Sequence, residues 1–290
     1  MQSEQLTFRE AWIRASSLLK QAETKDAKFE AELLLRHAAS LERHQLFLQL
    51  DEPLPEHLER VYFQSIDKRC SHMPVQYILG RQEFYGRDFY VDERVLIPRP
   101  ETELLIEQAL KRVEDEARIL DIGTGSGAIA VTLALESRDK CKNVSVYAVD
   151  ISDSALQVAK ENAKRFMAEK VHFCLADIWP SGVLQGDFAF DIIVSNPPYI
   201  DKSDWQQMDR EVKEYEPEIA LFAPEQGLAF YRRIISEARG KLRSGGWLGF
   251  EMGFQQAAAI KDMFHQCGYE QISVYEDLAG HARVMFAKMT

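Results

Sequence analysis

Four consecutive residues, Asn196-Pro197-Pro198-Tyr199, bring together groups that could hold a planar NH₂ group. The Asn196 side chain offers an amide oxygen, and the Pro197 carbonyl is a second hydrogen-bond acceptor. Because proline fixes φ and donates no N–H, the Pro197-Pro198 pair can direct that carbonyl outward. The ring of Tyr199 can stack on a flat substrate group. The alternative interpretation is that two adjacent prolines simply end the apolar strand before them.

An arrangement of this kind suits methyl transfer to an amide or an aryl amine. The lone pair of such a nitrogen is delocalised, which makes the nitrogen a poor nucleophile. Two acceptors on its N–H bonds would orient it and stabilise the positive charge that grows during attack. We therefore predict that Asn196 and Pro197 are catalytic, and that the substrate-binding residues are Asn196, Pro197, Pro198 and Tyr199. This chemistry requires no general base, and the sequence indicates none.

A glycine-rich segment, LDIGTGSGAIA at 120–130, predicts a cofactor site. Gly123, Gly125 and Gly127 let the backbone turn sharply and approach a ligand without an intervening Cβ. The segment follows a strand pattern and opens a helical one, and open α/β sheets bind ligands outside the carboxyl ends of their strands. Gly123, Gly125 and Ala128 also satisfy the dinucleotide pattern G-x-G-x-x-G/A. The segment alone therefore leaves NAD and S-adenosylmethionine both open.

Residues at the ends of neighbouring strands favour S-adenosylmethionine. Asp121 precedes the glycines, where a carboxylate would repel a pyrophosphate but suit a cationic sulfonium ligand with an amino group. Asp150 ends the second strand and is placed to bind ribose hydroxyls, although it could instead cap the next helix beside Ser152. Asp177 is placed to accept from an adenine amino group. Trp179 offers an apolar face for the base, or could belong to the core.

Alternating strand and helix patterns from Arg118 onward predict the sheet that would position these residues. Such alternation is typical of an α/β fold with a mainly parallel sheet covered on both faces. The last two strand patterns, within 269–288, have no helix between them and predict an antiparallel C-terminal edge. The strand patterns, seven in all, lie at 118–123, 144–150, 171–177, 190–196, 245–252 and, as a pair, 269–288.

Residues 1–74 predict a small helical domain. Apolar residues recur there at helical spacing, with charged residues of both signs between them. Between residues 75 and 98, alternating aromatics with Gly80 and Gly86 as breakers predict a β-hairpin that links this domain to a larger one at 99–290. Near the start of the larger domain, Pro100 predicts a helix start.

Composition argues against several classes of function. The net charge of −11 does not fit a general affinity for nucleic acid, because phosphate binding normally needs a basic surface. The four cysteines are far apart and include no C-x-x-C pair, which predicts reduced thiols and no metal site. The N-terminal stretch does not match a signal peptide, and no apolar run approaches the ~20 residues needed to cross a bilayer. We therefore expect a cytoplasmic protein that binds neither membrane nor metal.

The chain resembles the bacterial-type release factor glutamine methyltransferases, which methylate the side-chain amide of a glutamine in peptide chain release factors. The N-P-P-Y tetrad by itself is shared with adenine-N6 and other amino methyltransferases, whereas PRPETE together with the closing DLAG is far more particular to this family. The resemblance covers most of the chain and rests on LIPRPETE (96–103), LDIGTGSGAIA, SNPPYI (195–200), EPEIALFAPEQGLAFYRRI (216–234), GGWLGFEMG (245–253) and DLAGHARVMFAK (277–288).

The resemblance implies a class I S-adenosylmethionine-dependent methyltransferase fold, which is Rossmann-like. It implies glutamine N5 methylation with S-adenosyl-L-methionine as cofactor and S-adenosyl-L-homocysteine as product, and N-terminal helices that help to dock the release factor. We expect a monomer. One departure is LFAPEQGL at 221–228, which stands where the family usually has a glycine-rich turn and leaves the conformation of 216–227 open. Carried onto this sequence, the implied cofactor contacts are Gly123, Thr124, Gly125, Ser126, Gly127, Asp150, Trp179 and Asn196.

Three other functions remain open from the sequence. An adenine-N6 nucleic-acid methyltransferase could hold an adenine amine in the same way, but it should have a basic recognition region and aromatic platforms for a flipped base. An NAD-linked oxidoreductase should be stabilised against heat by a nicotinamide cofactor, and our hypothesis predicts stabilisation by S-adenosylmethionine. A non-catalytic binding module would need a degenerate site, whereas the expected site residues are all present. The N-terminal helices could instead form an oligomerisation surface.

Overall fold

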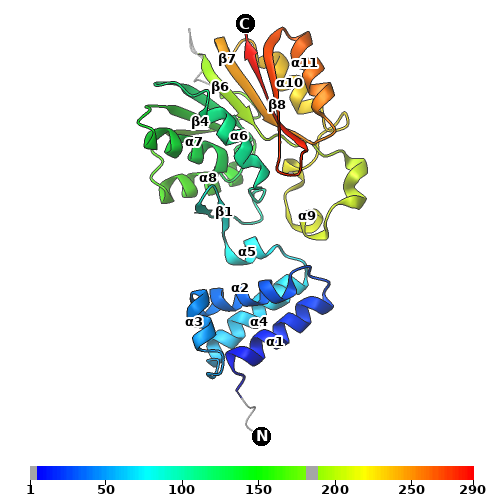
Figure 1. Ribbon diagram of the computed structural model, residues 1–290. Coiled ribbons are helices and arrows are strands. Elements are labelled where there is room, and N and C mark those ends of the chain that lie inside the picture. Colours follow the sequence, from blue (N-terminus) through cyan, green and yellow to red (C-terminus); the bar gives the residue numbers. More distant parts are fainter. Residues whose placement is uncertain (1–4, 181–188) are drawn as a thin grey trace. The chain divides into compact units, whose positions relative to one another are not determined.

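The computed structural model describes residues 5–180 and 189–290, and the chain divides into two compact units (Figure 1). The smaller unit comprises residues 1–80 together with 209–215. The larger unit comprises residues 81–208 and 216–290. The chain therefore passes between the units near residues 80, 208 and 215, whereas the sequence predicted a helical domain that ends at residue 74.

Helices form the smaller unit (Figure 1). The first helix is capped by Thr7, whose side chain accepts from the Glu10 N–H while the Glu10 carboxylate accepts from the Thr7 N–H. Apolar side chains such as Leu34 fill the interior, where the hydroxyl of buried Tyr62 donates to the Ala31 carbonyl at 3.0 Å. The helices are α1 (Phe8–Gln21), α2 (Ala27–Ala39), α3 (Arg43–Leu48), α4 (Glu56–Cys70) and α5 (Val75–Leu79).

A short segment from far along the sequence completes the smaller unit. This segment contains helix α9 (Arg210–Tyr215), and its Glu211 carboxylate pairs with Arg69 of α4 at 3.1 Å. The Tyr215 hydroxyl donates at 2.7 Å to the backbone carbonyl that follows α4. Arg69 is buried and also forms an ion pair with Glu30 of α2. One buried guanidinium therefore connects three helices, one of which the sequence did not place in this unit.

A seven-stranded sheet with the order β5-β4-β3-β6-β7-β9-β8 forms the centre of the larger unit. The strands from β5 to β7 in that order pair in parallel, and β9 pairs antiparallel with both β7 and β8. This arrangement confirms the mainly parallel sheet with an antiparallel C-terminal edge. The strands are β3 (Arg118–Ile122), β4 (Ser145–Asp150), β5 (Val171–Leu175), β6 (Phe190–Ser195), β7 (Leu242–Glu251), β8 (Tyr269–Glu276) and β9 (Ala282–Met289).

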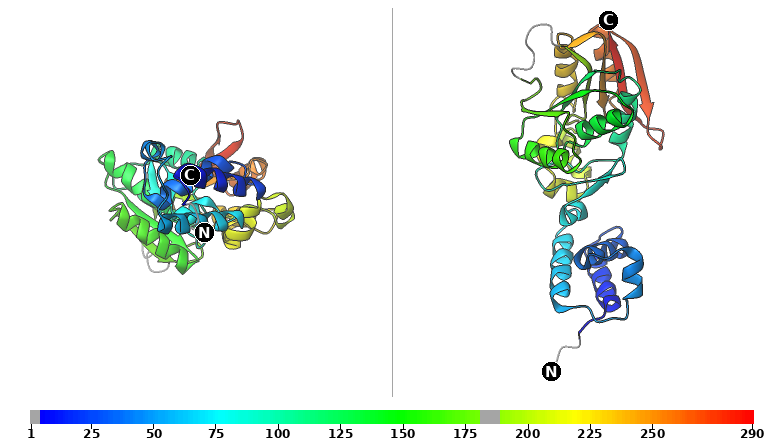
Figure 2. Two further views of the ribbon diagram at one scale, coloured as in Figure 1. Left: turned by 90° about the horizontal axis from the view of Figure 1, so that it is seen from below. Right: turned by 90° about the vertical axis from the view of Figure 1, so that its left-hand side faces the viewer.

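Helices cover both faces of this sheet (Figures 1 and 2). One buried apolar cluster joins the sheet to α6, α7 and α8, and a second cluster joins it to α10 and α11. Ile119 belongs to the first cluster and Leu120 to the second, so β3 buries apolar side chains on both faces of the sheet. Among the described residues, no helix of either unit is both long enough and apolar enough to cross a membrane. The helices of the larger unit are α6 (Glu101–Leu110), α7 (Ala128–Asp139), α8 (Asp153–Arg165), α10 (Ala229–Ala238) and α11 (Ala257–Gln266).

The β-hairpin predicted for 75–98 is shorter than expected. Strands β1 (Gln82–Phe84) and β2 (Arg87–Phe89) form a separate antiparallel pair. The first residues of the predicted hairpin form helix α5 instead, which ends at Gly80 in the left-handed conformation. Apolar side chains of α5 pack against the core of the smaller unit, so tertiary packing decides the conformation of this stretch.

The parallel register aligns the carboxyl ends of the central strands. Ile122, the last residue of β3, lies beside Val149 of β4 and beside Ser195, the last residue of β6. Asp150 is the last residue of β4, and the segments that follow β3 and β6 carry the predicted glycine loop and Asn196. They emerge at one edge of the sheet, where open α/β sheets bind their ligands.

Replacing Arg69 with Ala should destabilise the smaller unit and release α9. The Glu30 side chain is only 13% exposed and would lose its cationic partner, and breaking a buried ion pair costs about 3 kcal/mol. We expect a lower unfolding temperature and faster hydrogen exchange at the amides of 209–215. Arg60→Ala on the same helix is the matched control, because the Arg60–Glu56 pair is exposed and such pairs contribute less than about 1 kcal/mol. Unchanged exchange at 209–215 in the Arg69 variant would contradict the role given to this residue.

Candidate active site

A cavity lies at the carboxyl ends of β3, β4, β5 and β6. The loops after these strands line it, together with residues 94–96, helix α10 and the residues Pro217, Ile219 and Ala220. The cavity brings together seven of the predicted residues, namely Gly123, Gly125, Asp150, Asp177, Asn196, Pro197 and Pro198. The structure describes the other predicted residues too, but does not place them in the lining: Thr124, Ser126, Gly127, Trp179 and Tyr199.

The glycine loop turns sharply between β3 and α7. Gly123, Gly125 and Gly127 have φ of +73°, +55° and +81°, in the left-handed region that glycine tolerates without strain. A Cβ added at Gly123 or Gly125 would meet no atom within 4 Å, so the loop leaves open space where a ligand's atoms could lie. At Gly127 a Cβ would lie 3.1 Å from the Ala159 side chain, so this glycine allows close packing against α8. The three glycines therefore have two different tasks.

Asp150 lines the cavity next to the glycine loop. One of its carboxylate oxygens accepts from the Gly125 N–H at 2.9 Å and the other from the Ser152 N–H at 2.9 Å. The side chain that caps helix α8 belongs to Ser152, which accepts from the Ala155 N–H. Burial raises the pKa of Asp150, while the two backbone N–H groups lower it. The carboxylate thus shapes the glycine loop and retains lone pairs for a ligand.

Asp121 does not line the cavity. Its side chain is fully buried beneath the glycine loop and accepts from the Thr124 hydroxyl at 2.6 Å. Burial raises the pKa of Asp121 to about 7, against the Thr124 hydrogen bond that lowers it. The sequence placed this carboxylate near the ligand as a charge, but the structure gives it a position beneath the loop.

Asp177 and Trp179 lie close together in the sequence but differ in their surroundings. Asp177 lines the cavity, and its carboxylate forms an ion pair with Arg233 of α10. Trp179 packs against the second apolar cluster, and its indole N–H donates to Glu237 of the same helix. Ile178, between them, is the apolar residue of this segment that lines the cavity. The lining of the cavity in this segment therefore includes the apolar side chain of Ile178 but not that of Trp179.

The tetrad lies along the edge of the cavity and is fastened on both sides. The Ser195 hydroxyl just before it donates to the Ile122 carbonyl at 2.8 Å and ties β6 to β3. At its far end the Tyr199 carbonyl accepts from the Gln256 side chain at 3.0 Å. Residues 196–198 line the cavity described above, whereas Tyr199 lines a second cavity. The tetrad therefore contributes to the lining of two cavities of the larger unit.

Comparison with known proteins decides the family. A PrmC N-terminal domain model matches residues 10–80, and a methyltransferase domain model matches residues 113–229. A release factor glutamine methyltransferase of Bacillus cereus is 41% identical over 264 residues, which cover 89% of this chain and 91% of that protein. The one of Koribacter versatilis is 39% identical and covers 98% of this chain and 99% of that protein. The chain belongs to the release factor glutamine methyltransferase family.

A solved structure supports the same fold. A methyltransferase from Pyrococcus furiosus is 20% identical to the chain, with a TM-score of 0.51, and the likeness covers 71% of this chain and 90% of that one. Similarity at this level of identity concerns the fold alone. It agrees with the class I methyltransferase fold that the sequence predicted.

The cavity fits S-adenosylmethionine, the cofactor of this methyltransferase, which supplies a methyl group activated by its sulfonium. The open space at Gly123 and Gly125 allows a ligand to approach the backbone closely. Asp150 presents a carboxylate to the same cavity, and Ile178 and Phe230 present apolar surface. A carboxylate beside apolar surface suits a ligand that combines ribose hydroxyls with an aromatic base.

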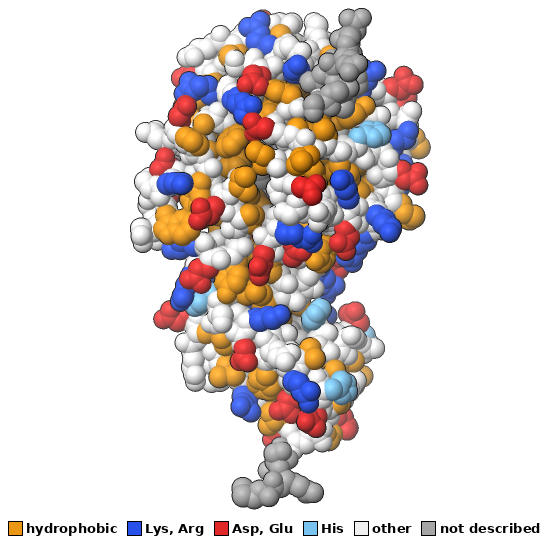
Figure 3. All heavy atoms as spheres, turned by 180° about the vertical axis from the view of Figure 1, so that it is seen from behind, with side chains coloured by type: hydrophobic (Ala, Val, Ile, Leu, Met, Phe, Trp, Pro, Cys, Tyr) orange, Lys and Arg blue, Asp and Glu red, His pale blue; other side chains and the backbone are white. Residues whose placement is uncertain are grey.

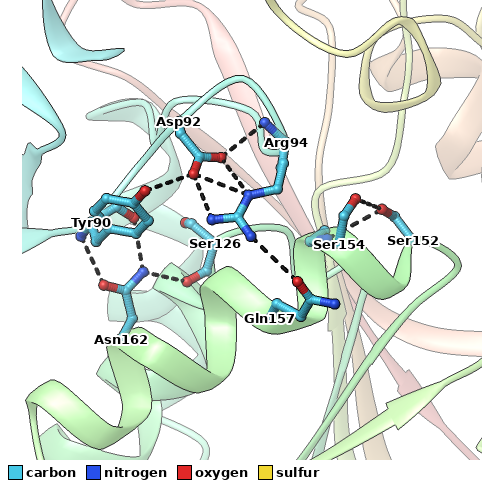
Figure 4. Close-up of polar contacts among 9 residues, drawn as sticks. Tyr90, Asp92, Arg94, Ser126, Ser152, Ser154, Gln157 and Asn162 are labelled. Carbon is cyan, nitrogen blue, oxygen red and sulfur yellow. Dashed lines mark hydrogen bonds and ion pairs between the residues drawn. The ribbon is translucent and has the colours of Figure 1, made fainter. Parts of the chain in front are cut away.

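Another segment of the cavity wall escaped the sequence analysis. Arg94 and the two residues after it line the cavity, and Figure 4 shows how this stretch is held. The amide of buried Asn162 on α8 donates to the Tyr90 and Ser126 carbonyls, both at 2.9 Å, and accepts from the Tyr90 N–H at 2.7 Å. One side chain thus fixes the glycine loop and the segment before Arg94 together. In the sequence, the feature that could have indicated this role is the polar residue Asn162 on the apolar face of a helical pattern.

The segment that departs from the family's glycine-rich turn adopts a left-handed conformation. Glu225, Gln226 and Gly227 have φ of 56°, 57° and 80°. Two non-glycine residues therefore occupy a conformation that glycine adopts more easily. Gly227 also approaches the tetrad, because a Cβ there would lie 2.0 Å from the Tyr199 carbonyl oxygen. At this position only glycine fits both the backbone conformation and the neighbouring backbone.

Replacing Gly227 with Ala should displace Tyr199 and lower turnover. The clash with the Tyr199 carbonyl forces one of the two segments to move, and misplacing reacting groups by about 1 Å can reduce rates by roughly 10²-fold. Gly86→Ala is the matched control, since Gly86 has a φ of +72° but nothing within 4 Å of the added Cβ. We expect both variants to lose stability to backbone strain, but only the Gly227 variant to lose turnover in a methyl-transfer assay. Equal turnover in the two variants would contradict this role for Gly227.

Proposed function

We propose that the enzyme transfers a methyl group from S-adenosylmethionine to the side-chain amide nitrogen (N5) of a glutamine in peptide chain release factors. Support comes from relatives of that description at 41% and 39% identity over most of the chain. The observation that carries the proposal is the position of Asn196 and Pro197 in the wall of the cofactor cavity. A tetrad that only ended a strand would not need to face the methyl donor.

Asn196 and Pro197 are proposed to hold the amide nitrogen of the substrate. The Asn196 side-chain oxygen accepts one N–H bond and the Pro197 carbonyl accepts the other, which orients the nitrogen lone pair toward the methyl group. As the N–C bond forms and the C–S bond breaks, the two oxygens stabilise the positive charge on the nitrogen. One N–H proton then leaves to solvent. The products are the N5-methylated glutamine and S-adenosylhomocysteine.

The cofactor is proposed to lie against the glycine loop and the ends of β4 and β5. Backbone groups of 123–127 contact it, Asp150 accepts from its ribose hydroxyls, and Ile178 with Phe230 covers its base. Asp177 is proposed to lie near the base, as the sequence predicted, with its charge neutralised by Arg233. The apolar face for the base, which the sequence assigned to Trp179, is proposed to come from Ile178 instead.

The second cavity is proposed to receive the polypeptide around the target glutamine. Its lining combines the aromatic residues Tyr199 and Phe254 with the polar residues Gln256 and Arg283. Backbone groups of an extended peptide need hydrogen-bond partners of this kind, and aromatic rings provide contact area at low entropic cost. Tyr199 belongs both to this cavity and to the tetrad, so a peptide bound here would lie next to the catalytic pair.

The smaller unit is proposed to dock the release factor. It exposes Ile13, Phe29, Phe47 and Leu48, with exposed fractions of 63%, 58%, 47% and 82%. Phe29 and Phe47 line one hollow of this unit, together with Trp12. Exposed apolar side chains that gather in this way often mark an interaction surface. We expect the enzyme to act as a monomer in the cytoplasm, where translation ends.

A nucleic-acid substrate is the alternative. On the face of the larger unit drawn in Figure 3, Lys and Arg side chains are interspersed with Asp and Glu. A mixed surface of this kind gives little of the electrostatic attraction on which nucleic-acid affinity depends. The net charge of −11 also argues against a nucleic-acid substrate.

Incubating the enzyme with methyl-labelled cofactor distinguishes the two substrates. We expect label to enter a release factor at a single glutamine, located by mass spectrometry, because the tetrad is placed to hold one carboxamide. Duplex DNA, transfer RNA and ribosomal RNA in parallel reactions should remain unlabelled. Label found only in nucleic acid would overturn the proposed function.

Asn196→Ala should abolish most methyl transfer while cofactor binding weakens only slightly. The variant loses one of two acceptors for the developing charge, and removing one such polar contact elsewhere costs roughly 10²-fold or more in kcat. The measurements are single-turnover methylation of a release factor and calorimetric titration with S-adenosylmethionine. Asn143→Ala, at an exposed position, is the matched control and should behave like the wild type. Wild-type turnover by the Asn196 variant would falsify the role of this side chain.

A further inference from the structure

Two buried residues, Thr102 and Glu251, form a hydrogen-bond chain with Asn196. The Asn196 Nδ2 atom lies 3.3 Å from Thr102 Oγ1, which lies 2.5 Å from Glu251 Oε2. Thr102 is 4% exposed and Glu251 is 2% exposed. Neither residue lines the cofactor cavity, and neither was predicted from the sequence to have a role. The side chains of Thr102 and Glu251 therefore lie behind Asn196, out of reach of a ligand.

The fold brings these three residues together from distant parts of the sequence. Strands β6 and β7 pair in parallel with Ser195 beside Phe250, so the next residues, Asn196 and Glu251, leave the two strands side by side. Thr102 is the second residue of α6, a helix that packs against both strands. The segments PRPETE and GGWLGFEMG, which identify the family, thus meet at the tetrad.

The direction of each hydrogen bond follows from the donors and acceptors present. An ionised carboxylate can only accept, so the Thr102 hydroxyl donates to Glu251. The Thr102 oxygen then has lone pairs but no hydrogen left, and it accepts from the Asn196 NH₂ group. The opposite orientation of the Asn196 amide would place its oxygen against the Thr102 oxygen, with no hydrogen between them.

We infer that Thr102 and Glu251 are positioning residues, which hold the Asn196 amide with its oxygen toward the substrate nitrogen. This inference rests on the role proposed above for Asn196. With the amide reversed, the Asn196 NH₂ group would face the substrate NH₂ group and could not accept from it. The developing positive charge on the substrate nitrogen would then meet a donor instead of an acceptor.

The charge on Glu251 sets the conditions for a test. Burial raises the pKa of Glu251 to about 7, against the hydrogen bond from Thr102 that lowers it. Nearby Glu101 on α6 raises the pKa further, whereas Arg283 on β9 and a hydrogen bond with Asn196 lower it. Tyr199 and Tyr231 are the other titratable groups that interact with this carboxylate. Because this pKa is about 7, the ionised form of Glu251 predominates at pH 8, and measurements at this pH examine the hydrogen bonds in the direction described.

The test is Thr102→Val, which keeps the side-chain shape and removes the hydroxyl. We expect kcat for release factor methylation at pH 8 to fall by about tenfold or more, because Asn196 loses one of the two buried partners, Thr102 and Glu251, that orient it. The dissociation constant for S-adenosylmethionine should stay within about threefold, since Thr102 does not line the cavity. Thr102→Ser restores the hydroxyl and should recover most of the lost kcat. If Thr102→Val does not fold, Glu251→Gln is the alternative test. The new glutamine amide can donate to Thr102, which would reverse the direction of the hydrogen bonds between residue 251, Thr102 and Asn196.

Thr132→Val is the matched control, since Thr132 is a fully buried residue of α7 whose hydroxyl has no hydrogen-bond partner among the described residues. It should keep the wild-type kcat. A double-mutant cycle then separates positioning from general damage. In an Asn196→Ala background, Thr102→Val should lower kcat no further, because the side chain it orients is gone. An undiminished effect in that background, or wild-type kcat in Thr102→Val alone, would overturn the inference. Full activity of Asn196→Ala alone would instead overturn the proposed role of Asn196.

Discussion

The parallel register of β3, β4 and β6 is the constraint on which the site depends. Ile122 lies beside both Val149 and Ser195, so the glycine loop, Asp150 and the tetrad begin at the same edge of the sheet. A slip of one residue would exchange the side chains on the two faces of a strand. Apolar clusters on both faces oppose such a slip, because each strand buries side chains in both directions. The interactions that stabilise the core therefore also fix the cofactor cavity.

Buried polar side chains complete the geometry that the register begins. Asn162 holds the glycine loop, Ser195 ties β6 to β3, and the pair Thr102–Glu251 bonds to Asn196. A buried polar group is costly without a partner, so each of these groups has a defined partner and direction. A reaction that depends on the orientation of one amide needs hydrogen-bond partners in defined positions. Polar groups behind the cavity wall thus help to fix the positions of the groups that line it.

The chain path links the two units through the segment that follows the tetrad. The backbone leaves the larger unit after residue 208, contributes α9 to the smaller unit, and returns at residue 216, just before Pro217, Ile219 and Ala220 of the cavity wall. Arg69 and the Tyr215 hydroxyl hold α9 within the smaller unit. Helix α9 therefore belongs to one unit, whereas the segments before and after it in the sequence belong to the other. An apolar pattern could not predict this, because α9 has no buried residue and its contacts are polar.

Local patterns in the sequence determined the strands, the glycine loop and the composition of the tetrad. They could do so because strand pairing follows apolar runs, while glycine and proline impose their backbone angles on their immediate surroundings. Tertiary structure alone decided which side chains meet. It turned Ile178 rather than Trp179 toward the cavity, and it joined Thr102 to Glu251 across 149 residues of sequence. The physical reason is that a buried polar group is satisfied by whatever partner packing brings within hydrogen-bond distance, and no local pattern records that distance.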